Sequence, residues 1–561
     1  CTFPLPAATL RPHSIPPPPP SSNMEAREAA QFGHYRKLKE LLNNGSVTAD
    51  WVDQDDCSLL HWAAINNRIP CAELVLGRGC NVNAVGGVLR STPLHWAARQ
   101  GHLRMVALLV RCGADQDKRD VEGFTALHVA AQFGKTPVVA YLVARGQSVD
   151  APDACMMTPA MWAVSKIFTS DPLNLMVTMG ADLTKRDSVY RNTVLHWASC
   201  HGNLMAVKTL VMCDIDLAAL NKENETALDM AKRREDLAVQ RVLEKASRIR
   251  GILPSTTFQR IYERPVTARR VLGCVPLLSY LFIALLTYIN LALPAKLFMI
   301  FLYFVAMYVF LRPFSLSDIN YAIPVNFAFA TKVVLIVSWV AYLHAVSTWY
   351  MQISFTVLLF LLPFVFFRVC LLDPGVIQTD YNERCKTIVA ISESEQGDSK
   401  FCHTCLILRP PRSKHCSECN VCLRRFDHHC PWLNTCVAAG NHRTFVAYLF
   451  LLVFATCVYM AGVLIYWRDV CGEITLRVGL ECDHWLLFSF YLAVVCCIFP
   501  LCLLITQLYQ ISLNVTTNER LNIKRYVHFE IGSHCLDIKS PFSTGISRNW
   551  YDFFCAQREE L

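Results

Sequence analysis

The chain has 561 residues, of which 53% are hydrophobic and 17% are charged, with a formal net charge of +8 at neutral pH. So many apolar residues and so few charges exclude a wholly soluble protein of this length. The positive charge is modest and comes without a basic array or an aromatic platform, so we expect no nucleic-acid partner. The composition predicts a mainly α-helical protein with a part in the lipid bilayer.

The first segment, residues 1–23, contains five consecutive prolines and no hydrophobic periodicity, so we expect it to be disordered. It lacks the charged-then-apolar pattern of a signal peptide, and the first methionine is Met24. We therefore expect the soluble N-terminal half that follows to stay in the cytosol.

Residues 24–248 form an internal repeat, whose anchors resemble Thr-Pro-Leu-His and recur every 33 to 35 residues. The anchors begin at Ser58, Thr92, Thr125, Thr158, Thr193 and Thr226. This period and signature are typical of ankyrin repeats, about seven in all when a degenerate leading repeat is counted. We expect the anchor histidines to be structural, and the solenoid to offer a concave surface for binding proteins.

After a linker at residues 249–270, apolar runs near the roughly 20 residues that a bilayer core requires predict six membrane spans. The spans lie at about 271–293, 295–311, 326–346, 350–372, 444–467 and 485–507, so that residues 271–372 hold four of them and residues 444–510 hold two. The second run is short and follows the first closely, so a re-entrant hairpin is an alternative there. Lys332 falls in the third span near its cytosolic end, where its side chain can snorkel.

Counting spans from a cytosolic N-terminal half places residues 373–443 and 511–561 in the cytosol as well. Basic residues at the predicted cytosolic ends agree with this topology. They are Arg269, Arg270, Arg368, Arg443, Lys524 and Arg525. Cys471 and Cys482 would then share a lumenal loop, where a disulfide can form, although the sequence does not decide whether they pair.

Seven cysteines and four histidines lie within residues 402–436, between the fourth and fifth spans. Zinc is bound tetrahedrally by thiolate and imidazole, and a Cys-x2-Cys turn supplies two ligands from one bend. Eight ligands, enough for two ions, are Cys402, Cys405, His415, Cys416, Cys419, Cys422, His429 and Cys436. The spacing does not assign ligands to ions, and a zinc-binding interaction module of the RING or ribbon type is the alternative interpretation.

Two reactive groups of this block, Cys430 and His428, are not needed as zinc ligands. An imidazole beside a thiol raises the thiolate fraction, and a carboxylate such as Asp427 can orient the imidazole and stabilise its cation. Asp427, His428 and Cys430 are therefore candidate catalytic residues, with Cys430 as the nucleophile.

The block resembles the cysteine-rich domain of the DHHC protein acyltransferases, the palmitoyltransferases, at every ligand position. The resemblance implies two structural zinc ions with interleaved ligands: Cys402, Cys405, His415 and Cys422 on one, and Cys416, Cys419, His429 and Cys436 on the other. It also implies ping-pong transfer of a palmitoyl group from palmitoyl-CoA to Cys430 and then to a substrate cysteine. The acyl chain is expected to lie among the membrane helices.

Further short motifs match this family in order and spacing. Asp373, Pro374 and Gly375 match its Asp-Pro-Gly motif, Thr516, Thr517 and Glu519 match its Thr-Thr-x-Glu motif, and Asn549 matches the polar residue of its C-terminal packing motif. Basic side chains near Cys430 are candidate contacts to CoA phosphates, although a solvated face or lipid headgroups explain them equally well. These are Arg409, Arg412, Lys414, Arg424 and Arg425.

The combination of ankyrin repeats, six spans and a DHHC block resembles one subfamily, the huntingtin-interacting palmitoyltransferases, and this chain keeps the full Asp-His-His-Cys tetrad. The resemblance implies residence in the Golgi and recruitment of protein substrates through short, proline-ended linear motifs. The groove positions that match are Asn66 and Trp96; packing between repeats is the alternative for Trp96. A rival from another class is a membrane scaffold or ion transporter whose zinc domain is structural.

Overall fold

The computed structural model describes residues 21–169, 171–289, 291–394, 401–475, 482–526, 530–531 and 538–555. The chain divides into two compact units, Cys1–Ala246 with Asp380–Ser399, and Ser247–Thr379 with Lys400–Leu561. Of the predicted disordered segment, residues 1–20 lie outside the described residues, and Ser21 begins the first helix.

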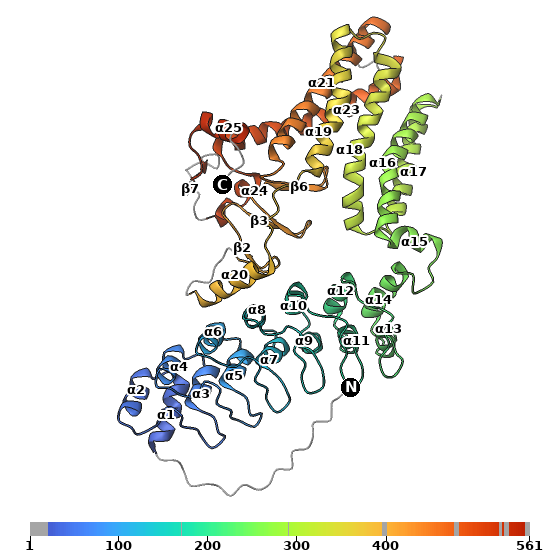
Figure 1. Cartoon of the computed structure of the whole chain (residues 1–561). Coiled ribbons are helices and arrows are strands. Elements are labelled where there is room, and N and C mark those ends of the chain that lie inside the picture. The colour runs from blue at the N-terminus through green and yellow to red at the C-terminus, as the bar shows by residue number, and fades with distance from the viewer. Residues whose placement is uncertain are drawn as a thin grey trace. The chain divides into compact units, whose positions relative to one another are not determined.

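The first unit is a row of short helix pairs (Figure 1). The pairs are α1(Ser21–Phe32) with α2(Tyr35–Asn43), α3(Leu59–Ile65) with α4(Ile69–Leu76), α5(Pro93–Gln100) with α6(Leu103–Arg111), α7(Ala126–Gln132) with α8(Thr136–Ala144), α9(Pro159–Lys166) with α10(Leu173–Thr178), α11(Val194–Cys200) with α12(Leu204–Met212), and α13(Ala227–Arg233) with α14(Leu237–Ile249). The first helix of each repeat packs against that of the next, as from α3 to α5 and from α5 to α7. The predicted ankyrin solenoid is confirmed.

Each anchor histidine ties its own repeat to the following one. In the third repeat, Thr92 and His95 form a capping box, with Oγ1 and Nδ1 2.8 Å apart, which satisfies amide groups at the start of α5. The other ring nitrogen, Nε2 of His95, donates to the carbonyl oxygen of Phe124 in the next repeat at 2.9 Å. His61, His128 and His196 make the same pair of contacts.

Among its described residues, the second unit contains six helices that are long and apolar enough to cross a membrane, in agreement with the six predicted spans. They are α16(Pro265–Tyr288), α17(Leu293–Leu311), α18(Leu316–Ser338) with its π-helical continuation η1(Trp339–Leu343), α19(Trp349–Leu371), α21(His442–Val470) and α23(His484–Leu513). A short helix, α15(Thr257–Glu263), precedes α16. Helix α18 begins ten residues before the predicted third span because the Ser315 hydroxyl caps it, accepting from the backbone N–H of Asp318 at 3.2 Å.

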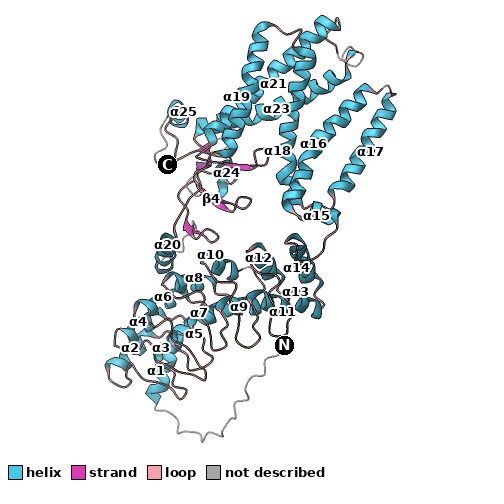
Figure 2. Cartoon of the chain, turned by 45° about the vertical axis from the view of Figure 1, so that its right-hand side comes forward, coloured by secondary structure: helices cyan, strands magenta, loops and turns pink. Residues whose placement is uncertain are grey.

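Short strands and helices complete the second unit, and the strands gather around the cysteine-rich region (Figure 2). Three two-stranded antiparallel sheets carry the cysteines: β1(Phe401–Cys402) with β2(Ile407–Leu408), β3(Lys414–Cys416) with β4(Val421–Leu423), and β5(His428–Cys430) with β6(Thr435–Val437). The C-terminal elements are α24(Thr517–Leu521), η2(Ile523–Arg525), β7(Glu530–Ile531), β8(Ile538–Lys539) and α25(Ile546–Phe554). One hydrophobic core joins the β5–β6 hairpin to α19, α21, α23 and α25.

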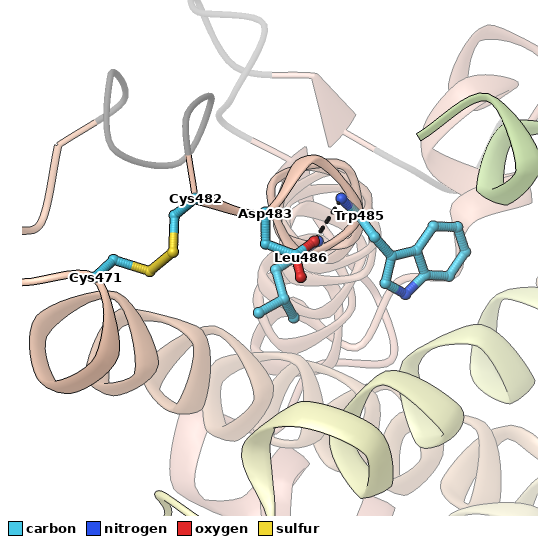
Figure 3. Close-up of a disulfide and its surroundings, with 5 residues drawn as sticks. All are labelled: Cys471, Cys482, Asp483, Trp485 and Leu486. Atoms are coloured by element: carbon cyan, nitrogen blue, oxygen red, sulfur yellow. Dashed lines mark hydrogen bonds between the residues drawn. A yellow bond between two sulfur atoms is a disulfide. The ribbon is translucent and has the colours of Figure 1, made fainter. Parts of the chain in front are cut away.

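A disulfide joins Cys471, at the end of α21, to Cys482, just before α23 (Figure 3). The next residue, Asp483, caps α23, because its carboxylate accepts from the backbone N–H groups of Trp485 and Leu486 at 2.8 and 3.0 Å. The pairing that the sequence left open is therefore present in the structure.

Candidate active site and metal centres

The three cysteine-rich hairpins bring the eight candidate zinc ligands into two groups. Within each group the candidate ligand atoms all lie within 4.8 Å of one another. One group is Cys402, Cys405, His415 and Cys422, and the other is Cys416, Cys419, His429 and Cys436. These are the interleaved sets that the family resemblance implies. Three sulfur atoms and one imidazole nitrogen at this separation fit a tetrahedral zinc ion with bonds of about 2.0–2.3 Å.

Strand geometry explains why the ligands interleave. Neighbouring residues of a strand point to opposite faces, so His415 and Cys416 of β3 belong to different groups. Directly paired residues share a face, so His415 meets Cys422 across the β3–β4 sheet, and His429 meets Cys436 across β5–β6. Sequence spacing carries no information about these pairings, whereas the register of the hairpins determines them.

The same alternation separates the candidate catalytic pair from the metal group. In β5, His429 faces one metal group, while His428 and Cys430 share the other face. His428 donates from Nδ1 to Oδ2 of Asp427 at 2.7 Å, and it also hydrogen-bonds to Cys430. The structure thus brings Asp427, His428 and Cys430 into a single carboxylate–imidazole–thiol series.

Electrostatics favour the charged form of both Asp427 and His428. Burial raises the pKa of Asp427, but hydrogen bonds from His428 and Thr517 and the nearby positive charge hold it well below its ordinary value. Burial lowers the pKa of His428, but the hydrogen bonds with Asp427 and Cys430 outweigh it and raise the pKa to about 9. An imidazolium beside a thiol stabilises the thiolate, which is the nucleophilic form of cysteine.

The Thr-Thr-x-Glu motif contacts the carboxylate of Asp427, a candidate catalytic residue, directly. Thr517 donates to Asp427 twice, from its backbone N–H at 2.7 Å and from its hydroxyl at 2.8 Å. Glu519 closes a capping box with Thr516 and accepts two hydrogen bonds from the buried guanidinium of Arg412, at 2.7 and 2.8 Å. Arg412 is 6% exposed, so the suggestion that it contacts CoA phosphates is wrong: it joins the cysteine-rich region to α24 instead.

Gln507 and His442 extend the polar series into the membrane helices, and the sequence analysis did not single them out. The side-chain amide of Gln507 donates to Oδ2 of Asp427 at 3.0 Å and accepts from Nε2 of His442 at 2.6 Å. Gln507 is 2% exposed and His442 is 6% exposed. The polarity of Gln507, the last residue of the predicted sixth span, was the available signal, because a polar group at such a position needs a partner.

The Asp-Pro-Gly motif folds back onto the cysteine-rich region. Asp373 accepts from the backbone N–H of Gly375 at 2.9 Å, which closes a tight turn, and Gly440 donates to the carbonyl oxygen of Pro374 at 2.9 Å. A Cβ at Gly440 would lie 1.9 Å from the carbonyl oxygen of Asp373, so only glycine fits there.

Asn549 braces the C-terminal helix α25. Its side-chain amide donates to the carbonyl oxygen of Ser512 at 2.8 Å and to the hydroxyl of Ser543 at 2.9 Å. It also accepts from the backbone N–H of Thr544 at 3.0 Å. The residue therefore ties α25 to the end of α23, next to the core that contains Cys430.

An apolar cavity of about 340 Å³ opens beside Cys430 among α18, α21 and α23. Its volume lies within the usual range for sites that hold small molecules. Its walls include Cys430, Trp432, Phe327, Leu452, Thr456, Cys496 and Phe499. The cavity places apolar space, which is compatible with a hydrocarbon chain, next to the sulfur of Cys430.

Lys332 lines this cavity. Its ammonium donates to the carbonyl oxygen of Ala328 at 3.0 Å and lies 4.9 and 5.7 Å from the ring centres of Phe366 and Tyr448. Cation–π attraction and one hydrogen bond compensate in part for the water that the charge has lost. Sequence position alone could not show that the surrounding helices enclose this side chain.

The repeat array has a second cavity, of about 420 Å³, at the predicted groove residue Trp96. It is lined by α5, α7 and the turns before them, and includes Ile65, Gly87, Leu89, Arg99, Phe124 and Phe133. Asn66 follows Ile65 directly, and its amide donates to the carbonyl oxygen of Trp62 at 2.9 Å. Trp96 also packs edge-on against Trp62, with ring centres 5.9 Å apart.

Comparisons with known proteins agree with this arrangement. The family profile described as "DHHC palmitoyltransferase" matches residues 395–524, and ankyrin-repeat profiles match residues 60–110, 86–153 and 190–222. Human "Palmitoyltransferase ZDHHC17" is 36% identical over 547 residues, which cover 95% of this chain and 86% of the relative. "Palmitoyltransferase Hip14" of Drosophila melanogaster is 33% identical over 564 residues, which cover 97% of this chain and 87% of the relative.

The fold and the site thus define an ankyrin-bearing acyltransferase with six candidate membrane helices. The chain belongs to the DHHC palmitoyltransferase family, and its activity is protein S-palmitoyltransfer. The rival interpretation, a membrane scaffold or ion transporter with a structural zinc domain, is not favoured.

Proposed function

We propose that Cys430 is the nucleophile of a ping-pong S-acyltransferase whose donor is palmitoyl-CoA and whose acceptors are cysteines of protein substrates. The observation that carries this proposal is the series from Asp427 through His428 to Cys430, whose side chain lines an apolar cavity. The fatty acyl chain occupies the cavity, where each buried methylene contributes roughly 0.8 kcal/mol.

The proton moves between Cys430 and His428 in each half of the cycle. His428 accepts the Cys430 proton, the thiolate attacks the thioester carbonyl of palmitoyl-CoA, and CoA leaves with the proton that His428 returns. His428 then accepts the proton of a substrate thiol, whose sulfur attacks the Cys430 thioester. The product keeps the acyl group, and His428 returns the proton to Cys430. Asp427 holds the imidazole in the tautomer that this exchange requires.

We also propose that the two cysteine–histidine groups each hold a zinc ion. Cys402, Cys405, His415 and Cys422 hold one, and Cys416, Cys419, His429 and Cys436 hold the other. When bound, the metal supplies folding free energy and no reactive group, since all four ligand positions are taken by protein. The hairpin β5–β6, which carries both a metal group and Cys430, is thereby fixed in place.

Autoacylation tests the catalytic proposal. Purified protein in detergent is given an alkyne analogue of palmitoyl-CoA, and the label is tested for release by hydroxylamine, which cleaves thioesters. The wild type is expected to carry labile label and Cys430→Ser to carry none. Cys496→Ser is the matched control, because Cys496 lines the same cavity but has no part in the proposed chemistry. Equal label on the wild type and Cys430→Ser would refute the assignment.

We further propose that the cavity at Trp96 binds short, proline-ended segments of protein substrates, with Asn66 at its edge. Trp62, Trp162 and Trp197 occupy the equivalent position in their repeats, and each indole N–H donates to an aspartate, at 2.9, 2.8 and 3.2 Å. In the third repeat Gly87 stands where those repeats have aspartate. Among the described residues, the Trp96 indole has no hydrogen-bond acceptor, so it is free to donate to a bound peptide.

Peptide binding to the full-length protein tests this groove. A fluorescent proline-ended peptide is expected to bind the wild type and to lose affinity about tenfold with Trp96→Phe, which keeps an aromatic ring but removes the N–H group. Trp162→Phe, the same change in another repeat, is the control. Equal affinity of the wild type and Trp96→Phe would contradict the proposed role of the indole.

We propose, finally, that the repeats, the cysteine-rich region and the C-terminus face the cytosol of a Golgi membrane. The disulfide between Cys471 and Cys482 supports this topology, because disulfides persist in the oxidising lumen and the loop between α21 and α23 lies opposite the cysteine-rich region by span count (Figure 3). Protease protection of sealed Golgi vesicles tests it: the repeats are expected to be digested and that loop to be protected.

A further inference from the structure

A helix that the sequence analysis did not predict lies in the segment between the fourth span and the first zinc hairpin. This helix, α20(Tyr381–Glu393), belongs to the compact unit of the repeat array although its neighbours in sequence belong to the other unit. It packs against α6 and α8, which are the second helices of their repeats (Figures 1 and 2).

One face of α20 is buried in this contact. Ile388 is 3% exposed and Ser392 is 7% exposed, while Cys385 is partly buried. These three residues follow the spacing of one helical face, at i, i+3 and i+7. Lys386 and Ala390 are exposed. The face that carries Ile388 is therefore turned to the array.

A polar contact fastens the C-terminal end of α20. Glu393 accepts a hydrogen bond from the hydroxyl of Tyr141 at 2.9 Å and forms an ion pair with Arg145. Arg145 also donates to the Tyr141 hydroxyl at 3.1 Å, so that the three side chains form a closed set. Tyr141 is fully buried, and Glu393 and Arg145 are both partly shielded from water. Shielding makes such a set more specific than an exposed surface ion pair.

We propose that α20 is an intramolecular anchor that binds the second helices α6 and α8 of the array and thereby keeps the Trp96 groove within reach of the acyl-transfer site. The groove is lined by the first helices α5 and α7 and by the turns before them, so the anchor and the substrate use different faces of the same repeats. This inference rests on the proposed recruitment of substrates by the repeats.

Chain connectivity gives the anchor its reach. Residues 372–380 join α19 to α20, and residues 394–400 join α20 to β1. Nine extended residues span at most about 30 Å and seven at most about 25 Å. A docked α20 therefore limits how far the array can move from the cysteine-rich region. Short tethers of this kind raise the effective concentration of a bound substrate.

Hydrogen exchange in the full-length protein tests the docking. Ile388→Asp puts a charge into the buried face, and Ala390→Asp puts the same charge on the exposed face of the same helix. Amides of residues 381–393 are expected to exchange about tenfold faster in Ile388→Asp than in the wild type, and Ala390→Asp is expected to match the wild type. Equal exchange in Ile388→Asp and the wild type would overturn the anchor.

A charge swap provides a second, independent readout. Glu393→Arg and Arg145→Glu are each expected to speed exchange in α20, and the double variant is expected to slow it again because the ion pair is restored in reverse. Exchange in α11 serves as the control for the fold of the array. If the α20 amides exchange no more slowly in the double variant than in the single variants, the Glu393–Arg145 ion pair does not stabilise the docked helix.

The functional consequence is measured in cells with alkyne-palmitate labelling of proteins. Groove-dependent substrates are those that lose their label with Trp96→Ala. Ile388→Asp is expected to lower their labelling severalfold while autoacylation stays at the wild-type level, and Ala390→Asp is expected to lower neither. Unchanged labelling of these substrates in Ile388→Asp would overturn the anchor. If no substrate loses its label with Trp96→Ala, the recruitment proposal is refuted. The exchange experiments then test the docking of α20 by themselves.

Discussion

The repeat array and the cysteine-rich region both rely on histidine, but they use it in opposite ways. In the array, His95 lies between a threonine hydroxyl and a backbone carbonyl, and burial lowers its pKa, so it stays neutral. In the cysteine-rich region, His428 lies between a carboxylate and a thiol, and its pKa is raised to about 9. The hydrogen-bond partners of a buried imidazole, and not the residue type, determine whether it is suited to stabilise a turn or to transfer a proton.

The largest loss of activity is expected from changes at the two cysteine–histidine groups, where histidine neither caps a turn nor transfers a proton. Cys416→Ala or His429→Ala is expected to release zinc, unfold the hairpins and abolish autoacylation, because structural zinc supplies folding free energy. His403→Ala is the control, since His403 is an exposed histidine of the same block and belongs to neither group. Zinc content and autoacylation are measured together. Full activity in a metal-free Cys416→Ala protein would contradict the two-zinc proposal.

The next largest effect is expected at the carboxylate that distinguishes His428 from the histidines of the array. Asp427→Asn keeps the shape of the side chain but removes the charge that raises the pKa of His428, so the imidazolium is no longer stabilised. The rate of autoacylation is expected to fall by roughly 10²–10⁴-fold. Zinc content should stay at the wild-type value, which separates this loss from unfolding. A rate within threefold of the wild type would show that Asp427 is not needed.

A smaller effect is expected at Gln507, which acts on His428 only through Asp427. Gln507→Met keeps the volume of the side chain but removes the hydrogen bonds to Asp427 and His442, and we expect a loss of about ten- to a hundredfold. The loss should fall on kcat, with the KM for palmitoyl-CoA unchanged. Thr506→Val, at the adjacent and only partly buried position of the same helix, is the control, since the Thr506 hydroxyl donates to the carbonyl oxygen of Cys502 and not to Asp427. A change in KM alone would contradict a positioning role.

The smallest effect concerns pH and the stability of the array. The pKa values of His61, His95, His128 and His196 are lowered by burial, that of His128 to about 4. Their stabilising contribution is therefore present above pH 6.5 and is lost as pH falls from 6.5 toward the folded-state values. We expect a loss of about 1 kcal/mol per histidine between pH 7.5 and 6, measured by hydrogen exchange in the array. His128→Gln should weaken this dependence, and a flat profile in the wild type would contradict it.

The contribution of His428 has the opposite sign. Its pKa is raised, so the stability that it supplies is complete below pH 6.5 and is lost as pH rises through about 9. The repeat array is therefore expected to lose stability as pH falls, whereas the contribution of His428 is lost as pH rises.

The features that depend on local pattern could be predicted from the sequence. The period of 33 to 35 residues predicted the solenoid, the apolar runs predicted six membrane helices, and the spacing of cysteine and histidine predicted eight ligands, enough for two zinc ions. These inferences succeed because a capping box, a bilayer-length helix and a Cys-x2-Cys turn are each formed by residues close in the chain.

The contacts between residues far apart in the chain could be seen only in the tertiary structure. It paired Arg412 with Glu519, enclosed Lys332 between aromatic rings, and connected Gln507 to Asp427. It also folded the segment after the fourth span into α20 and placed that helix on the repeats. Such contacts follow from packing and strand register, which depend on the whole fold, so no spacing in the sequence records them.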